Sequence, residues 1–383
     1  MEQAVRNILI DILRTVLNGE QGDDALKAKL TPDVLPSLLR LSKKHDVAHM
    51  VSAFLFQNEI EMSPETLGAF QREEMLSVFR YERMQYAFSE ICDTFDGVGI
   101  AYVPLKGAVI RAHYPSESMR TSCDIDLLIH EEDLEKAMVS LEQKGYRCGD
   151  RAYHDVSLYS PNDIHLELHF HIQENMESLD SVLRDVWSYA TLADKSRYVL
   201  SDEFFAFYLF AHMAYHFLAG GCGIRALMDL WVMEHRMGIV PSCAEHLLEQ
   251  AGIAQFAIEM RAIAEQCFTH TQRDAFAETV LTYIFDGGIY GGRENRIAVV
   301  KSKGTNTLSY VLGRLFPPYR SMKISYPILI RVPVLLPFCW MARWFSMLFG
   351  RKTRRVMAEM STVTGTTDEK IDEITQIRSR LGL

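Results

Sequence analysis

The chain has 383 residues, and its 48% hydrophobic content with only 12 prolines is typical of a globular protein with a sizeable core. This composition excludes a disordered protein, and the length allows roughly two or three compact units. The formal net charge of −10 disfavours general nucleic-acid binding. Seven scattered cysteines without Cys-x-x-Cys spacing indicate reduced thiols, and the charged, amphipathic first residues indicate no signal peptide. We therefore expect a cytoplasmic protein without disulfides.

Residues 1–96 are predicted to form an N-terminal helical region, because apolar side chains recur there at intervals of three and four. Thr31, which precedes Pro32, is the expected N-cap of the second helix. The predicted helices span residues 2–17, 32–58 and about 64–95.

The pattern changes at Gly97 to short apolar runs separated by turn residues, so residues 97–178 are predicted to form an α+β core with a small mixed β-sheet. Pro161-Asn-Asp163 has the composition of a hairpin turn. The expected elements are a strand at 99–105, a helix at 107–113, a strand at 123–129, a helix at 131–144, and paired strands at 153–160 and 164–172.

Two carboxylates lie one residue apart at the start of the strand at 123–129. Alternate residues of a strand point to the same face, so Asp124 and Asp126 should lie side by side. On an otherwise apolar strand this pair is unfavourable unless a cation lies between the two groups. Oxygen ligands of this kind suit Mg²⁺ or Mn²⁺. The alternative is a strand end whose two aspartates cap a helix or face solvent.

Upstream of this pair, Lys106-Gly107 forms a turn before the helix at 107–113. A glycine allows backbone N–H groups to approach a phosphate, and a helix N-terminus favours an anion. This turn is therefore a candidate site for the phosphates of a nucleotide.

The segment from Asp163 to Ile172 alternates strictly, with apolar residues on one face and His165, Glu167, His169 and His171 on the other. Glu167 is the predicted third carboxylate of the metal site. Asp163 lies at the hairpin turn and Glu174 lies beyond the alternating run, so neither is favoured for this role. Three carboxylates are the minimum for holding two metals roughly 3.5–4 Å apart during displacement at phosphorus.

These motifs together resemble the nucleotidyltransferases of the DNA polymerase β superfamily and, more narrowly, a bacterial group known as an uncharacterised nucleotidyltransferase family. The motifs are Lys106-Gly107, Arg120, Asp124-Ile-Asp-Leu-Leu-Ile129 and Glu167-Leu-His169. The resemblance implies a nucleotidyltransferase core between helical regions. It also implies transfer of a nucleotidyl group from an NTP such as ATP to an acceptor hydroxyl or phosphate, with Mg²⁺ or Mn²⁺ as cofactor; the sequence does not identify the acceptor.

The resemblance assigns roles to the individual side chains. Asp124 and Asp126 would bind both metals, and Glu167 would bind the metal that activates the acceptor or act as general base. Lys106 and Arg120 would hold the triphosphate. The wider superfamily usually has Gly-Ser or Gly-Gly where this chain has Lys-Gly, so no serine hydroxyl is available at that turn.

Residues 179–292 are predicted to be helical again and to contribute to the nucleotide and substrate site. His212 and His216 are four residues apart, as are Arg225 and Asp229, so each pair shares a helix face. Two interpretations stay open: core histidines with an Arg–Asp ion pair, or His216 and Arg225 facing the nucleotide. The glycine-rich residues 286–292 lack the Gly-Lys-Ser/Thr end of a P-loop and are interpreted as a flexible connector.

Residues 293–383 form a basic, apolar C-terminal region, with 13 Lys/Arg against one acidic residue from Arg293 to Arg355. Arginines and prolines interrupt the apolar residues 326–349, so no transmembrane helix is predicted. Residues 326–355 either pack on the main body or make peripheral contact with a membrane, because basic clusters such as 351–355 attract anionic lipid. The end of the chain is predicted to form a docked helix with Ile371, Ile374, Ile377 and Leu381 on one face.

Two other functions are compatible with the sequence. His165, Glu167, His169 and His171 have the ligand types and strand spacing to bind a transition metal in a hydrolase or oxygenase. That hypothesis leaves the pair of Asp124 and Asp126 unexplained. The other is a non-catalytic nucleotide-binding protein, which the presence of all three carboxylates disfavours.

Overall fold

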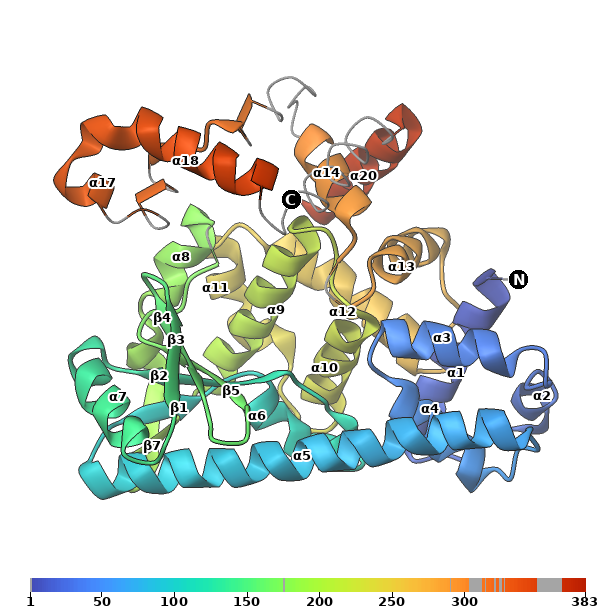
Figure 1. Ribbon diagram of the computed structural model, residues 1–383. Helices are drawn as coiled ribbons and strands as arrows, with labels where there is room; N and C mark the ends of the chain where they lie inside the picture. The colour runs from blue at the N-terminus through green and yellow to red at the C-terminus, as the bar shows by residue number, and fades with distance from the viewer. Residues whose placement is uncertain are drawn as a thin grey trace.

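A computed structural model describes residues 2–174, 176–289, 291–302, 312–313, 315–319, 322–323, 326, 328–349 and 367–383. The structure is α+β, with a seven-stranded mixed sheet flanked by helices on both sides in the chain order (Figure 1). The predicted fold class is confirmed.

The short helix at Asp24–Lys27 was not predicted, and the N-terminal helices otherwise differ from the prediction mainly in the segment 32–58. The helix there begins at Leu35 and not after Thr31, and it is interrupted at residues 45–47. Asp46 adopts a φ of 54°, which ends a right-handed helix. The elements are α1 (Glu2–Asn18), α2 (Asp24–Lys27), α3 (Leu35–Lys44), α4 (Ala48–Gln57) and α5 (Pro64–Val98).

Helix α5 connects the N-terminal helices with the sheet (Figure 1). Its 35 residues correspond to a length of about 50 Å. The Ser63 hydroxyl caps the first turn by accepting from the Thr66 N–H, and Gly99 ends the helix with a φ of 66°. Phe70 is buried among the N-terminal helices, whereas Ile91 and other apolar side chains near its end are buried against the sheet. One helix therefore fixes the sheet relative to the helical region.

The sheet has the strand order β3-β4-β5-β2-β1-β7-β6. Strand β2 lies at its centre, parallel to β5 and antiparallel to β1, and β4 and β5 form the predicted hairpin. The strands are β1 (Tyr102–Pro104), β2 (Asp124–Ile129), β3 (Arg147–Arg151), β4 (Asp155–Tyr159), β5 (His165–His169), β6 (Ala190–Asp194) and β7 (Arg197–Leu200). The segment predicted as a helix at 131–144 is a 3₁₀ turn followed by α7 (Leu134–Glu142).

The region 179–292, predicted to be helical, consists mostly of helices but also contains one hairpin that was not predicted. Strands β6 and β7 form an antiparallel hairpin, and β7 joins the sheet by a parallel bridge between Arg197 and Tyr102. Strand β6 is the edge strand and is largely exposed, β7 next to it is only partly buried, and the residues of the two strands show no clear apolar alternation. Hydrophobic periodicity therefore does not predict this hairpin.

Eight further helices join the N-terminal helices in the larger hydrophobic core, where α12 packs on α1. They are α8 (Glu177–Leu183), α9 (Asp202–Leu218), α10 (Ile224–His235), α11 (Glu245–Gln250), α12 (Ala254–Phe268), α13 (Ala275–Gly287), α14 (Arg293–Ser302) and α20 (Asp368–Leu381). Helix α20 packs on α12 and α14 with Ile374, Ile377 and Leu381 buried, which confirms the predicted docked helix.

The glycine-rich segment after α13 packs backbone to backbone against the loop between α9 and α10. The Gly292 N–H donates to the Gly220 carbonyl at 2.9 Å. A Cβ at Gly291 would lie 2.8 Å from the Gly220 carbonyl carbon, and both glycines have positive φ. This contact, rather than a connector role alone, explains the glycines on both segments.

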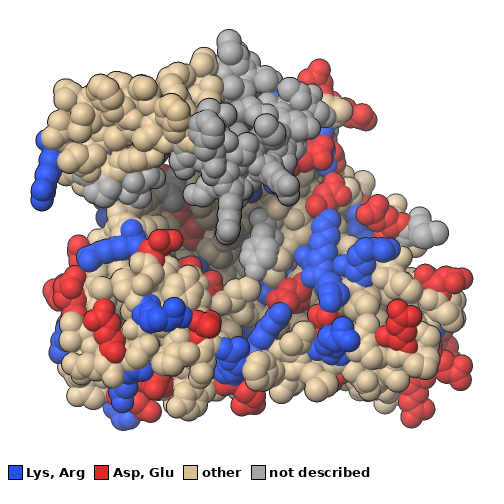
Figure 2. Space-filling model, viewed as in Figure 1, with Lys and Arg blue, Asp and Glu red and all other residues tan. Residues whose placement is uncertain are grey.

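The residues predicted to pack or to contact a membrane form a helical arm, residues 328–349, which comprises α17 (Ile328–Arg331), a 3₁₀ turn at Pro333–Leu335 and α18 (Leu336–Phe349). Figure 2 shows that this arm presents mostly uncharged side chains. None of the helices in the described ranges is long and apolar enough to cross a membrane. The basic cluster at 351–355 lies outside the described residues.

The buried His45 at the α3–α4 break makes stability depend on pH. Its ring lies 4.5 Å from that of Phe285, its Nδ1 accepts from the Ile224 N–H at 3.4 Å, and burial, with the nearby Lys44 charge, lowers its pKa from 6.5 to about 4. The unfolded chain therefore binds the proton more tightly, and stability falls as the pH drops from 6.5 toward 4.

Between pH 7 and pH 5 the free energy of unfolding should fall by about 2 kcal/mol less in His45→Asn than in the wild type, because the variant lacks the histidine. Urea unfolding at both pH values measures this difference. The exposed His113 provides a matched control, because His113→Asn should behave as the wild type. Equal pH dependence of the wild type and His45→Asn would contradict the prediction.

Candidate functional site

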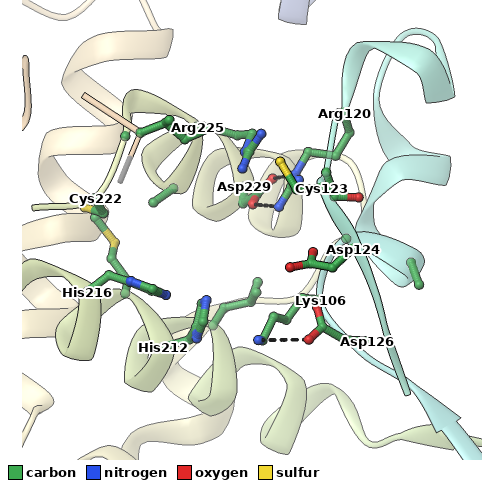
Figure 3. A pocket seen from close by; sticks show the side chains of 18 of the residues that line it. Lys106, Arg120, Cys123, Asp124, Asp126, His212, His216, Cys222, Arg225 and Asp229 are labelled. Atoms are coloured by element: carbon green, nitrogen blue, oxygen red, sulfur yellow. Dashed lines mark hydrogen bonds and ion pairs between the residues drawn. The ribbon is translucent and has the colours of Figure 1, made fainter. Parts of the chain in front are cut away.

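The register of β2 and β5 determines which side chains share a face. In this parallel pair Asp124 lies opposite His165, and Asp126 lies opposite Glu167. Ile125 lies between the two aspartates. It and the apolar residues of β5 are buried in the core behind the sheet. Alternation therefore places the acidic and histidine side chains together on the other face, where the three carboxylates Asp124, Asp126 and Glu167 line a cleft. Figure 3 shows the two aspartates in it.

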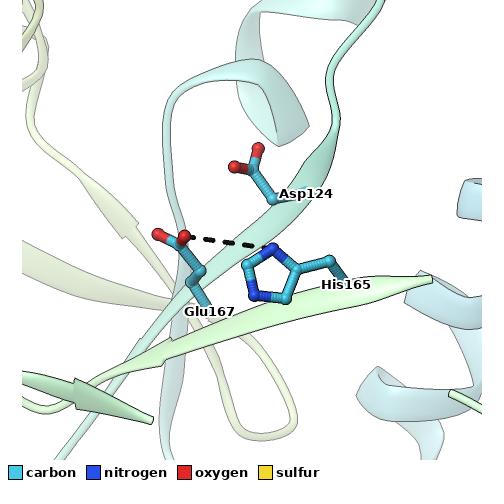
Figure 4. Close-up of side chains that lie close together, drawn as sticks. All are labelled: Asp124, His165 and Glu167. Atoms are coloured by element: carbon cyan, nitrogen blue, oxygen red, sulfur yellow. Dashed lines mark ion pairs between the residues drawn. The ribbon is translucent and has the colours of Figure 1, made fainter. Parts of the chain in front are cut away.

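Two overlapping groups of side chains have ligand atoms close enough to share a metal ion. Asp124, His165 and Glu167 form one group (Figure 4), and Asp126, Glu167 and His169 form the other. Within each group the ligand atoms lie within 4.8 Å of one another. Glu167 belongs to both groups, so a single carboxylate is within reach of both aspartates.

The other carboxylates considered from the sequence lie elsewhere. Asp163 is exposed at the hairpin turn, where it pairs with Arg147. Glu174 is buried, and its Oε1 lies 2.8 Å from Nδ1 of His212. His171, a member of the transition-metal hypothesis, pairs with Glu131 and joins neither ligand group among the described residues.

The surroundings of the three carboxylates shift their pKa values in different directions. Burial raises the pKa of Asp124, and the neighbouring Asp126 raises it further. Burial and both aspartates likewise raise the pKa of Glu167. Burial opposes ionisation of Asp126 as well, but Lys106 and His169 hold its pKa well below the usual range. At Asp124 and Glu167 the nearby positive groups thus do not offset burial and mutual repulsion, and such oxygen donors are the chemistry expected of a site for a hard divalent ion.

Lys106 occupies a strained turn before the carboxylate strand. Its φ of 43° is unusual for a residue with a side chain, and it precedes the short helix α6 (Gly107–Ile110) and a 3₁₀ turn at 111–113. The Lys106 ammonium lies 3.4 Å from Asp126 Oδ1. Burial disfavours its charge, but Asp126 and other nearby groups raise its pKa well above normal, so the side chain is a buried cation.

Arg120 forms a buried bidentate ion pair with Asp229 of α10. Its Nε and Nη2 donate to the two carboxylate oxygens at 2.7 Å each, and the Tyr114 hydroxyl donates to Asp229 Oδ1 at 2.6 Å. Arg120 lines the cleft. Its partner is not Glu117 or Asp124, which are close to it in the sequence, but Asp229, which is 109 positions away. The contact of Arg120 with a phosphate stays a prediction.

Arg225 and Asp229 share a face of α10 as predicted, yet each bonds to a residue of another element. The Arg225 guanidinium donates to Asp46 Oδ2 at 3.3 Å and to Thr121 Oγ1 at 3.1 Å. Burial and the nearby Arg120 lower the pKa of Arg225. The α3–α4 break thus brings the Asp46 carboxylate to the edge of the cleft and links the N-terminal helices to it.

The cleft has a volume of about 310 Å³ and lies between the sheet and helices α9 and α10 (Figure 3). His212 and His216 of α9 face the carboxylates across it, with ring centroids 4.3 Å apart. Burial, with the adjacent His212, lowers the pKa of His216 to about 3, so that ring is neutral near pH 7. The predicted site residues that line the cleft are Lys106, Gly107, Arg120, Asp124, Asp126, Glu167, His216 and Arg225.

Sequence reasoning missed several polar residues of the site. Asp46 was hidden inside a predicted continuous helix, and Asp229 was considered only as a partner of Arg225. The Glu174–His212 pair joins residues 38 positions apart. The i, i+4 spacing of His212 and His216 was the one available signal, and it did not distinguish a core pair from a cleft wall.

Both walls of the cleft lie in a part of the chain that is similar to a known protein family. Residues 34–269 match the model of a protein family described as "Uncharacterised nucleotidyltransferase". No curated protein and no solved structure gives a significant match. The matched span contains the whole sheet and helices α9 and α10, and therefore both walls of the cleft.

Proposed function

Since this chain belongs to the family of uncharacterised nucleotidyltransferases, we propose that it transfers a nucleotidyl group from an NTP to an acceptor hydroxyl or phosphate with the help of Mg²⁺ or Mn²⁺. One observation carries the proposal: Asp124, Asp126 and Glu167 meet on one sheet face, inside a cleft that also contains the Lys106 ammonium. Carboxylates and a cation in one cleft are the groups that phosphoryl and nucleotidyl transfer requires.

The carboxylates fit a hard divalent ion, because all three offer oxygen donors and, at Asp124 and Glu167, the nearby positive groups do not offset burial and mutual repulsion. Asp124, Asp126 and Glu167 would hold it. Bound there, Mg²⁺ would polarise the α-phosphate and lower the pKa of the acceptor oxygen. Glu167, within reach of both aspartates, is the proposed ligand or general base on the acceptor side.

The rest of the cleft supplies groups for the phosphates and the nucleotide. Lys106 is a protonated donor beside the carboxylates, and Arg225 and Arg120 lie along the wall formed by α10. We place the phosphates between these cations. His212, whose Nδ1 is held by Glu174, has its other ring nitrogen available to hydrogen-bond a substrate.

The substitution Glu167→Gln tests the site directly. It removes one charge from both ligand groups while keeping the side-chain shape. We expect the affinity of the full-length protein for a non-hydrolysable Mg²⁺–nucleotide to fall at least about tenfold, or 1.4 kcal/mol. Isothermal titration calorimetry measures this affinity, and transfer of label from α-labelled NTPs to cell-extract acceptors measures turnover.

Asp150→Asn is the matched control, because this exposed aspartate on the edge strand β3 undergoes the same loss of charge away from the cleft. It should bind the nucleotide as the wild type does. Unchanged affinity in Glu167→Gln would refute the assignment of Glu167. Nucleotide binding without any transfer would favour a non-catalytic nucleotide-binding protein.

One observation favours a second candidate, a transition-metal enzyme: each of the two ligand groups includes a histidine, His165 or His169. Imidazole nitrogens suit Zn²⁺ and Fe²⁺ better than Mg²⁺. Metal analysis of purified protein separates the two functions. Zinc or iron retained through dialysis, with no nucleotide binding in Mg²⁺, would support the second candidate.

A further inference from the structure

The helical arm defined above, residues 328–349, exposes an apolar stripe. Val334, Phe338, Met341 and Phe345 follow one another at intervals of four, three and four residues, and they are 47–78% exposed. This spacing places Phe338, Met341 and Phe345 on one side of α18, and Val334 lies in the 3₁₀ turn directly before it. The stripe is therefore a continuous surface and not a set of scattered side chains.

The opposite side of α18 is already occupied. Cys339 is buried there, and the indole N–H groups of Trp340 and Trp344 donate to the backbone carbonyls of Pro317 and Leu315. The helix is thus apolar on its packed side and on its exposed side alike. A helix of this kind is normally covered on both sides, by protein or by lipid.

Helix α17 extends the same kind of surface. Ile328, Ile330 and Val332 are also exposed. In Figure 2 the arm projects beside the main body, and its visible surface is almost wholly uncharged, apart from a basic side chain at its end. The arm therefore combines a broad apolar surface with very few polar groups.

The charge of this part of the sequence is opposite to that of the whole protein. From Asn295 to Ala358 the sequence contains 12 Lys/Arg and no acidic residue, although the complete chain has a net charge of −10. Among the described residues Lys323 and Arg331 of this basic segment are exposed, and Arg331 precedes Val334 of the stripe by three residues. An apolar surface among exclusively basic charges matches a bilayer interface with anionic headgroups, which offers both complementary features at once.

We propose that the arm binds the surface of a membrane that contains anionic phospholipids. Val334, Phe338, Met341 and Phe345 enter the boundary between headgroups and acyl chains, and Lys323 and Arg331 contact the headgroups. The binding is peripheral, in agreement with the absence of a membrane-crossing helix from the described residues. The proposal is independent of the chemistry in the cleft.

Vesicle co-sedimentation of the full-length protein tests the proposal. We expect the wild type to bind phosphatidylcholine vesicles that contain phosphatidylglycerol and to bind pure phosphatidylcholine at least tenfold more weakly. Binding should decrease as salt is raised, because the headgroup contacts are screened. Phe338→Ser combined with Phe345→Ser should weaken binding to the anionic vesicles at least tenfold.

Matched variants separate the arm from general surface effects. Phe79 on α5 is 57% exposed, close to the 59% of Phe345, and Phe79→Ser should bind as the wild type does. Lys323→Glu with Arg331→Glu should weaken binding, whereas Arg72→Glu with Lys144→Glu, an equal charge change at exposed sites elsewhere, should not.

Three results would overturn the proposal. The first is a wild type that does not bind anionic vesicles at low salt. The second is unchanged binding by the Phe338→Ser, Phe345→Ser protein. The third is a wild-type dimer that the same two substitutions dissociate in sedimentation velocity, without any vesicle binding, since a second copy of the chain would then cover the stripe.

Discussion

The substitutions Asp124→Asn and Asp126→Asn are expected to abolish nucleotidyl transfer equally and to change the stability of the metal-free protein in opposite directions. If the two aspartates bind the metal as proposed, loss of either carboxylate should reduce transfer by more than the roughly 10–100-fold typical of an outer-shell partner. Ionised Asp126 stabilises the fold through Lys106 and His169, which lower its pKa, so Asp126→Asn should be destabilising. The pKa of Asp124 is raised, so its charge is unfavourable and Asp124→Asn should be stabilising.

The expected loss for Asp126→Asn is about 1.5–3 kcal/mol, the usual contribution of a hydrogen bond to a charged group. Denaturant unfolding in EDTA at pH 7 measures both variants. Adding Mg²⁺ should stabilise the wild type more than either variant, because the wild type alone keeps the full set of carboxylates. Equal and same-sign changes in stability would show that the two aspartates do not differ in their surroundings.

The second large effect is expected from the buried pair of Arg120 and Asp229. Removing one partner of a buried ion pair leaves an uncompensated charge and typically costs about 3–5 kcal/mol. Asp229→Leu should therefore lower the free energy of unfolding by about that amount, as measured in urea. Since a domain of ordinary stability has only about 5–15 kcal/mol, this change is a large part of the total.

A double variant separates the charge from the packing. Arg120→Met with Asp229→Leu removes both charges and should recover part of the stability, although the Tyr114 hydroxyl then loses its acceptor. The exposed pair of Arg147 and Asp163 is the control, and Arg147→Met should cost no more than about 1 kcal/mol. If the double variant were no more stable than Asp229→Leu alone, the pair would not act as a compensated charge.

The carboxylate site could be predicted because its signals are local. The alternation of β5 placed Glu167 on the polar face, and the one-residue spacing of Asp124 and Asp126 placed both on one side of β2. Each is a property of a few consecutive residues. The division of the chain at residues 96, 178 and 292 stays a prediction, as does a cytoplasmic location.

The far wall of the cleft could not be predicted in the same way, because it depends on contacts between distant elements. Arg120 meets Asp229 across 109 positions, and Arg225 meets Asp46 across 179. The break that exposes Asp46 depends on one residue with positive φ inside an otherwise helical pattern. Nothing in the local periodicity of residues 32–58 distinguishes that break from a continuous helix.

The parallel register of β2 and β5 also limits how this protein can change in length during evolution. Glu167 reaches the aspartates because it lies directly opposite Asp126. One residue inserted between His165 and Glu167 would turn the glutamate toward the apolar core and bring a leucine into the cleft. One residue inserted at the 161–163 turn would leave both strands in phase. Related chains should therefore tolerate length differences at this turn and none inside β5.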